Sequence, residues 1–214
     1  MRHLFAEAFR LQLLQGLEER LLWQGFARVA GVDEVGRGCL AGPVVAAALI
    51  PRPGRLVPGV DDSKRLSPER RAALAERLRE SSLAVAVVAV EPPVIDRVNI
   101  LEATRRAMRA ALARLDPAPD CALVDAVQLA GAPCPCFAVV RADSLSYAVA
   151  AASIVAKVER DRMMTELDRR YPHYGFSRNM GYGAPEHLSA LAEYGPCPSH
   201  RLTFRSVLPR VAEA

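Results

Sequence analysis

The chain has 214 residues, 51% of them hydrophobic, and a formal net charge of +4 at pH 7. A chain of this length and apolar content can bury a sizeable core, and it fits one large domain better than two. No apolar run approaches the roughly 20 residues that cross a bilayer, and the modest positive charge favours contact with a polyanion without proving it.

The amino-terminal segment does not look like a signal peptide, because Glu7 and Arg10 interrupt its apolar stretch. The cysteines are odd in number and irregularly spaced, which argues against a disulfide framework and for a reducing compartment. They are Cys39, Cys121, Cys134, Cys136 and Cys197. We therefore expect a cytoplasmic protein, and nothing in the sequence demands more than a monomer.

The first third of the chain predicts a helix followed by two strands. Residues 4–24 carry leucines at helical spacing until Gly25 offers a stop, so we expect one amino-terminal helix packed on the body. Residues 28–33 and 44–50 are apolar strand candidates on either side of a glycine-rich turn. Together they suggest a hairpin-like pair.

Residues 51–62 are rich in proline and glycine, which predicts an exposed loop. Ser67 and Pro68 then provide the N-cap and first residue of a helix that runs to about residue 80. A strand at 83–90 and a helix after Pro93 follow.

The next apolar run, 121–125, completes a strand, helix, strand sequence that demands parallel strands. Asp125 would end an inner parallel strand, and sites in open α/β sheets gather beyond the carboxyl ends of such strands. A short strand at 137–140 and a long helix at 146–171 come next, and the first half of this helix should be buried. A short helix is expected at 185–194.

Four carboxylates, those of Asp33, Glu34, Asp125 and Asp143, each close an apolar run or precede a helix. A hard cation such as Mg²⁺ prefers oxygen ligands and is usually held by carboxylates together with the phosphates of its substrate. Adjacent residues of a regular strand point to opposite faces, so Asp33 and Glu34 share one site only if the strand ends or twists there. The alternative is a solvated strand end before a turn.

Six motifs, in order along the chain, resemble bacterial ribonuclease HII. They are V-D-E-V-G-R-G-C-L-A-G-P-V at 32–44, D-D-S-K-R-L-S at 61–67, N-I-L-E-A-T-R-R-A-M at 99–108, A-A-A-S-I-V-A-K-V-E-R-D at 150–161, G-Y-G at 181–183 and H-R-L-T-F at 200–204. The resemblance implies an α/β fold, with a ribonuclease H-like mixed sheet flanked by helices and a carboxy-terminal helical extension. It also implies a catalytic core at 27–170 and a substrate-gripping region of the same domain at 171–214, which leaves the predicted amino-terminal helix as an extension at 1–26.

The activity that the resemblance implies is metal-dependent hydrolysis of the RNA strand of RNA/DNA hybrids, with nicking 5′ of ribonucleotides embedded in duplex DNA. Such an endonuclease leaves 5′-phosphomonoesters and serves ribonucleotide excision. The family's four acidic residues match Asp33, Glu34, Asp125 and Asp143, which would be both catalytic residues and ligands of Mg²⁺ or Mn²⁺.

The resemblance also implies six substrate-binding residues: Gly36, Arg37, Gly38, Ser63, Lys64 and Tyr182. In the family the Gly-Arg-Gly turn presents main-chain groups near the ribose, whose 2′-hydroxyl distinguishes RNA from DNA. The tyrosine contacts the ribonucleotide at its junction with DNA, and the Ser-Lys pair contacts the backbone. Two positions depart from the family pattern, Ala126 where glycine is usual and Met180 where lysine is usual.

Other interpretations remain open. A non-catalytic nucleic-acid-binding protein of the same fold would not need four converging acids, and a nucleotide phosphotransferase would need a Gly-Lys-Ser/Thr ending that the glycine-rich turn lacks. Cys134, Cys136, Cys197 and His200 could bind zinc, although C-P-C is tighter than the usual spacing. The charge run at Lys157, Arg160 and Arg162 is typical of the solvated side of a helix.

Overall fold

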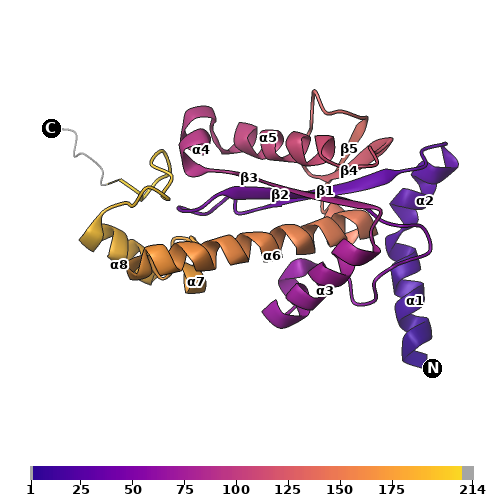
Figure 1. The fold of residues 1–214 in the computed structure, drawn as a ribbon, viewed down its shortest axis with the longest axis horizontal. Helices are drawn as coiled ribbons and strands as arrows, with labels where there is room; N and C mark the ends of the chain where they lie inside the picture. The colour runs from indigo at the N-terminus through magenta and orange to yellow at the C-terminus, as the bar shows by residue number, and fades with distance from the viewer. Residues whose placement is uncertain (1, 209–214) are drawn as a thin grey trace.

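A computed structural model describes residues 2–208, which form a five-stranded mixed sheet with helices on both faces (Figure 1). The strands are β1 (Val29–Val35), β2 (Val44–Ile50), β3 (Ala84–Val90), β4 (Cys121–Asp125) and β5 (Cys136–Val139). Their order across the sheet is β3-β2-β1-β4-β5. β1 and β2 pair antiparallel, as the hairpin-like prediction requires, and β2 pairs antiparallel with β3.

The remaining two pairings are parallel, between β1 and β4 and between β4 and β5. β4 is therefore an inner parallel strand with Asp125 at its carboxyl end, as predicted. The chain reaches β4 from β3 through α4 (Pro92–Val98) and α5 (Ile100–Ala113). We expected one helix here, but Asn99 adopts a φ of 68° and its side chain caps α5 by accepting from the Glu102 amide.

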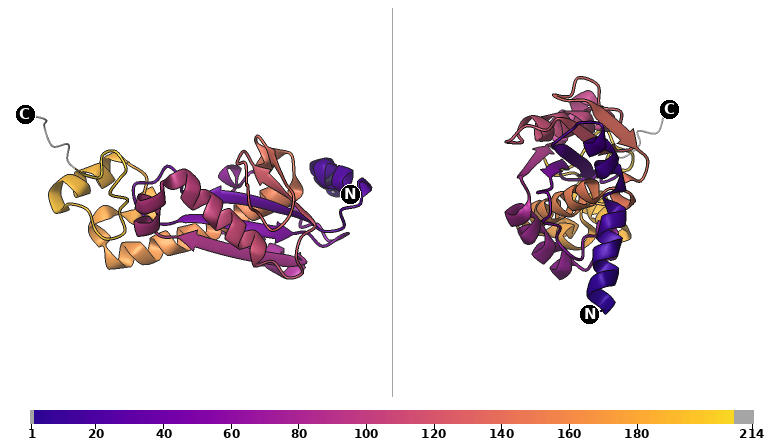
Figure 2. Two further views of the ribbon diagram at one scale, coloured as in Figure 1. Left: turned by 90° about the horizontal axis from the view of Figure 1, so that it is seen from above. Right: turned by 90° about the vertical axis from the view of Figure 1, so that its right-hand side faces the viewer.

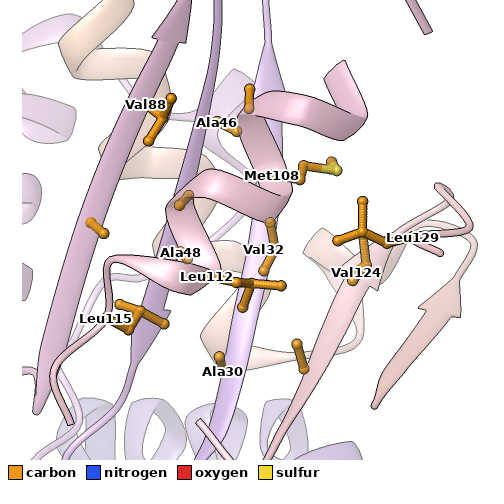
Figure 3. Packing of buried hydrophobic residues seen from close by; sticks show 14 of the residues in the cluster. Ala30, Val32, Ala46, Ala48, Val88, Met108, Leu112, Leu115, Val124 and Leu129 are labelled. Carbon is orange, nitrogen blue, oxygen red and sulfur yellow. The ribbon is translucent and has the colours of Figure 1, made fainter. Parts of the chain in front are cut away.

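Side chains of the inner strand β2 alternate between the two halves of the core. Ala46, Ala48 and Ile50 face α5, whereas Ala47 and Leu49 face the long helix α6 (Tyr147–Arg170) and α3 (Pro68–Ser81). Figure 3 shows the α5 side, where Met108 and Leu112 of that helix pack onto the strands. A strand covered on both faces has no solvent-facing side, so all seven residues of β2 are apolar and buried.

α6 lies unusually close to β1 because both contribute small residues. A Cβ atom at Gly31 would come within 2.1 Å of the Ala148 carbonyl carbon, so only glycine fits at this crossing. The helix begins as predicted after Ser146, whose hydroxyl accepts from the Val149 amide. The close approach sets the buried first half of α6 directly beneath the strand that carries Asp33 and Glu34.

The expected single amino-terminal helix is two helices, α1 (Arg2–Leu14) and α2 (Gly16–Trp23), with a break at Gln15. The two halves pack on different parts of the core. Leu11 of α1 joins the cluster beneath α3 and α6, whereas Leu21 of α2 packs against β1 and β4. One straight helix cannot reach both sites, and Gly16, a poor helix former, follows the bend.

The carboxy-terminal region forms η3 (Pro172–Tyr174), α7 (Phe176–Asn179) and α8 (Pro185–Tyr194), at the opposite end of the molecule from α1 (Figures 1 and 2). α8 has the predicted bounds. There are also two short 3-10 turns. η1 (Ser63–Arg65) ends the proline-rich loop, and η2 (Ala142–Ser144) precedes α6. Among residues 2–208, no helix combines the length and apolar character needed to span a membrane.

Candidate active site

Asp33 and Glu34 lie in the last three residues of β1 and point to its two faces. The Asp33 side chain faces α6, is almost fully buried, and accepts a hydrogen bond from Ser153 as well as one from the Glu34 amide at 2.8 Å. Glu34 Oε1 accepts from Arg37 Nη1 at 3.2 Å. The other oxygen, Glu34 Oε2, is buried and has no hydrogen-bond partner in the described part of the chain.

Asp125 lies beside this pair because β4 runs parallel to β1, with Val124 opposite Val32. Asp125 Oδ1 accepts from the Ala142 amide at 2.8 Å, which draws the η2 turn, and Asp143 within it, toward the strand end. The carboxylates of Asp33 and Glu34 both interact electrostatically with that of Asp125, and so does Asp143. The structure thus brings the four predicted acids together around Asp125.

Burial raises the pKa of three of these carboxyl groups. Burial and the neighbouring Glu34 carboxylate raise the pKa of Asp33 well above its usual value. Burial raises the pKa of Glu34 against the opposing effect of Arg37, and burial and the charge of Asp125 raise the pKa of Asp143. Each ionised carboxylate is therefore unfavourable here without a compensating positive charge.

The acids are grouped but not yet aligned as ligands. Within residues 2–208, no set of three or more His, Cys, Asp or Glu side chains is arranged to hold a metal ion as it stands. Two of the oxygens point to other partners, Glu34 Oε1 to Arg37 and Asp125 Oδ1 to the Ala142 amide. A cation would have to compete with the first of these contacts, which is exposed to solvent on the arginine side.

The turn after β1 needs glycine at its first position. Gly36 has a φ of +91°, and a Cβ atom there would lie 2.1 Å from Arg160 Nε. By contrast, a Cβ at Gly38 would meet nothing within 4 Å, so this glycine leaves open space toward solvent. The backbone of the turn is therefore closely backed on its inner side and open on its outer side.

Two buried arginines, neither of which the sequence patterns assign to the site, form that backing. Arg201 donates to the carbonyl oxygens of Gly36 at 2.7 Å and Arg37 at 2.9 Å, and twice to that of Gly42. Burial lowers the pKa of its guanidinium to about 10. The H-R-L-T-F motif contained this residue, but nothing in the motif indicates that a charged side chain turns inward.

Arg160 is the second of these arginines, and its position corrects an expectation. We expected Lys157, Arg160 and Arg162 on the solvated side of α6, but Arg160 is completely buried. It donates to the carbonyl oxygens of Pro43 at 3.0 Å, Ala41 at 3.1 Å and Met180 at 2.9 Å. Arg162 does face solvent. The helical spacing places one residue of the run inward, toward carbonyl groups that no sequence pattern reveals.

Tyr182 lies beside the Gly-Arg-Gly turn. The Gly181 carbonyl accepts from the Leu40 amide at 2.7 Å, which ties the two loops together, and the phenol ring is half exposed next to Cys39. Ser63 and Lys64 diverge. The Ser63 hydroxyl is buried against Ser153 Oγ at 3.0 Å, whereas Lys64 extends into solvent with its Nζ 3.9 Å from Asp143 Oδ2.

The zinc alternative is wrong. Cys134 and Cys136 pack on the α5 side of the core, whereas Cys197 and His200 lie at the carboxy-terminal helices. All five cysteines are free thiols, which agrees with the prediction that they form no disulfide framework.

Comparison with known proteins identifies the family. The family model for ribonuclease HII matches residues 30–207. Ribonuclease HII from Geobacter metallireducens is 49% identical over 211 residues, which cover 95% of this chain and 99% of that protein. The chain belongs to the ribonuclease HII family.

Solved structures agree. The crystal structure of ribonuclease H2 from Pyrococcus horikoshii superposes with a TM-score of 0.74 at 30% identity, covering 84% of this chain and 95% of that one. A structure of Bst-RNase HIII in complex with Mn²⁺ has a TM-score of 0.66 at 21% identity, over 84% and 68% of the two chains, and shows the shared fold alone. The predicted ribonuclease H-like fold is confirmed.

As a ribonuclease HII, the protein is an enzyme that cleaves RNA in RNA/DNA hybrids and at ribonucleotides embedded in DNA. This confirms the predicted activity and leaves no need for the alternative of a non-catalytic binding protein. The two positions that depart from the ribonuclease HII pattern are both residues with a positive φ. Ala126 has a φ of 49° and Met180 a φ of 51°, in the left-handed region that glycine tolerates best.

Proposed function

We propose that Asp33, Glu34, Asp125 and Asp143 are the catalytic acids and that they hold divalent cations, Mg²⁺ or Mn²⁺, together with the scissile phosphate. The observation that carries this is the buried Glu34 Oε2, which has no hydrogen-bond donor among residues 2–208 although burial makes its charge costly. Ribonuclease H enzymes depend on metal ions, and a cation is the partner that an oxygen in this position requires.

Cations bound in such a site supply two effects, activation of a water and stabilisation of the departing 3′ oxygen. The side chains of this chain do the rest. The ionised carboxylates only accept, so they serve as ligands and not as nucleophiles toward an anionic phosphodiester. The Ala142 amide fixes the direction of Asp125, and Ser153 fixes that of Asp33.

Recognition of the ribose falls to the Gly-Arg-Gly turn. Arg201 holds the carbonyl oxygens of Gly36 and Arg37, and in a trans peptide the N–H points away from the carbonyl. The amides of Arg37 and Gly38 therefore point outward, where a 2′-hydroxyl can accept from them. A Cβ atom at Gly38 would meet no atom of the described chain within 4 Å, so the backbone there is open to an approaching sugar.

Lys64 and Tyr182 complete the proposed substrate site. The exposed Lys64 ammonium near Asp143 suits a phosphate beside the acids, and the half-exposed ring of Tyr182 suits the sugar at the junction of RNA with DNA. Ser63 would contribute through its position, because its hydroxyl is bonded to Ser153. The region 171–214 grips the duplex in this proposal, and its described part adjoins the turn through Gly181.

The test is nicking of a duplex that carries one embedded ribonucleotide. Wild-type protein with Mg²⁺ or Mn²⁺ should cut 5′ of the ribonucleotide, and a chelator should stop cleavage. Asp125→Asn should lower the rate by about a thousandfold or more while binding of the duplex changes little. Glu76→Gln, on the exposed face of α3, is the matched control and should cut at the wild-type rate.

Calorimetry of metal binding gives a second measurement that does not depend on activity. Mg²⁺ or Mn²⁺ should bind to wild type and more weakly to Asp125→Asn. Cleavage by Asp125→Asn at the wild-type rate would refute the role of the acids. We also propose that the enzyme acts as a monomer in the cytoplasm, and analytical ultracentrifugation with and without duplex checks the first part.

A further inference from the structure

Two histidines behind Tyr182 are completely enclosed. His187 comes from α8 and His200 from the segment that follows it, and neither side chain has more than 2% of its surface exposed. Their Nε2 atoms are 2.9 Å apart. Two ring nitrogens at this distance form a hydrogen bond only if one carries a proton and the other does not.

The contacts at the outer nitrogens determine which tautomer each ring adopts. His187 Nδ1 lies 2.7 Å from the Tyr182 carbonyl oxygen, which can only accept, so Nδ1 carries a proton and Nε2 is the acceptor. The Cys197 amide donates to His200 Nδ1 at 3.0 Å, so Nδ1 is unprotonated and His200 Nε2 carries the proton. The Cys197 carbonyl is a poorer partner for Nδ1, at 3.3 Å, and already accepts the His200 amide at 2.9 Å.

The result is a directed chain of hydrogen bonds. It runs from the Cys197 amide through the His200 ring and the His187 ring to the carbonyl oxygen of Tyr182. Both rings must be neutral, because an added proton would make two N–H groups face each other. We call this chain the histidine relay.

The surroundings of the relay favour the neutral form. The ring of Tyr174 packs edge-on against His200 with centroids 4.7 Å apart, and Phe176 packs perpendicular to His187 at 5.4 Å. Burial lowers the pKa of both imidazoles. In an apolar enclosure a hydrogen bond is stronger than in water, and an unpaired donor costs more.

The relay ends on the backbone of the residue proposed to read the ribonucleotide junction. The Tyr182 amide donates to the Asn179 carbonyl at 2.9 Å, and its own carbonyl accepts from the Ala184 amide at 2.8 Å as well as from His187. The backbone is thus held on both sides while half of the side chain remains open to solvent. The fixed backbone determines where the phenol stands relative to the Gly-Arg-Gly turn.

We propose that His187 positions Tyr182 through its bond to the Tyr182 carbonyl, and that His200 holds His187 in the tautomer that this bond requires. This positioning sets the preference of the enzyme for a ribonucleotide at a DNA junction over a continuous hybrid. The inference rests on the proposed role of Tyr182. The relay touches neither the acids nor the metal ligands, so its loss should act on substrate preference and not on hydrolysis as such.

Two similar polar substitutions of His187 distinguish a role in positioning Tyr182 from a role in packing alone. His187→Asn keeps an N–H where Nδ1 was, and so keeps the bond to the Tyr182 carbonyl. His187→Gln keeps a polar group where Nε2 was, facing His200, and loses the bond to Tyr182. Both remove ring packing against Phe176, so a purely structural role predicts equal effects.

The measurement is the ratio of kcat/KM on a duplex with one embedded ribonucleotide to kcat/KM on an RNA/DNA hybrid. His187→Gln should lower this ratio about tenfold, toward that of Tyr182→Ala, and His187→Asn should stay within about threefold of wild type. His173→Leu is the matched control, because this histidine of the same region is exposed and, within residues 2–208, its ring stacks on Tyr194 outside the relay. Thermal unfolding checks that each variant is folded at the assay temperature.

Equal ratios for His187→Asn and His187→Gln would overturn the relay. If Tyr182→Ala itself leaves the ratio unchanged, the role of Tyr182 fails and the relay fails with it. Hydrolysis of the hybrid reports separately on the acids, so failure of the relay cannot be mistaken for failure of the metal site. The double variant Tyr182→Ala, His187→Gln should be no worse than Tyr182→Ala alone, and additive losses would also refute the relay.

Discussion

At the ends of β1 and β4, buried carboxylates lie beside one another, whereas at the neighbouring glycine turn buried guanidinium groups lie beside backbone carbonyls. Asp33 and Glu34 repel each other and Asp125, and one of their oxygens has no partner among the described residues. Arg201 and Arg160 spread their donors over carbonyl oxygens of two loops. The acid cluster is thus incomplete without substrate and metal, and the basic support is already complete.

In our proposal the two regions therefore have different roles, one in binding metal and the other in supporting the backbone. The acids carry a cost in the free protein that a bound cation relieves, which is the condition for strong binding. Burial also opposes the charge of Arg201, but its donors are already paired with backbone carbonyl oxygens, and the histidine relay is neutral. These groups hold the substrate-reading backbone in place without a bound ion. Substitutions in the two regions should therefore change stability in opposite directions.

The largest expected effect is at Arg201. Arg201→Leu should lower the free energy of unfolding by on the order of 3–5 kcal/mol, because the carbonyls of Gly36, Arg37 and Gly42 lose their donor inside the protein. Urea denaturation measures this. Arg205→Leu, an exposed arginine of the same segment, should change stability by about 0.5 kcal/mol or less. A similarly small effect at Arg201 would contradict the proposed support of the turn.

The second effect is the pH dependence of the relay. Burial lowers the pKa of folded His200 to about 4 from its usual 6.5, so the unfolded chain binds more protons between these values. Stability should therefore fall as the pH drops from about 6.5 to about 4, by up to about 3 kcal/mol from this group. Denaturation of wild type and His200→Gln at several pH values checks this, and the variant should show a shallower slope. Equal slopes would count against the neutral relay.

The third prediction reverses the sign of the first. Asp33→Asn should raise the free energy of unfolding by about 1 kcal/mol at pH 7 in the presence of chelator, because it removes a buried carboxylate whose pKa burial raises. The raised pKa means that this carboxyl favours folding at low pH and opposes it as the pH rises. Mg²⁺ should stabilise wild type but not the variant, and a destabilised variant in chelator would contradict the comparison.

The sequence predicts the positions of the helices and strands better than the points at which a helix breaks. The positions of the strands, the Ser67 cap and the bounds of α8 follow from local patterns, and the structure confirms them. β1 continues to Val35, two residues beyond its predicted end. The breaks at Gln15 and Asn99 do not follow from local patterns, because each depends on where distant surfaces lie. Local propensity determines which segments become helices, and tertiary packing determines where they bend.

The site divides in the same way. The four acids were predicted from the resemblance to ribonuclease HII, supported by their positions at the end of an apolar run or before a helix. The glycines were predicted from the same resemblance and because glycine lets a backbone turn closely. The supporting roles of Arg160, Arg201, His187 and His200 were not predicted. The arginines donate to backbone carbonyl oxygens, and the two histidines bond to one another. Backbone acceptors carry no sequence signature, so a buried arginine and a surface arginine look alike in the chain.

The smallest effect concerns Ala126, one of the two positions where the chain departs from the family. Its φ of 49° lies in the left-handed region, which costs a residue with a Cβ atom about 1 kcal/mol relative to glycine. Ala126→Gly should therefore stabilise the protein by roughly 0.5–1 kcal/mol, although glycine gains entropy in the unfolded chain. Ala130→Gly, in a nearby exposed turn, should destabilise it slightly, since Ala130 has no positive φ to relieve. Thermal unfolding of the two variants compares them directly.

Ala126 directly follows Asp125, so nicking by Ala126→Gly tests whether the strained backbone matters for catalysis. A stabilised variant with unchanged nicking would show that the strain takes no part in catalysis. A loss of nicking would mean that the strained turn holds the Asp125 carboxylate in the direction that catalysis requires.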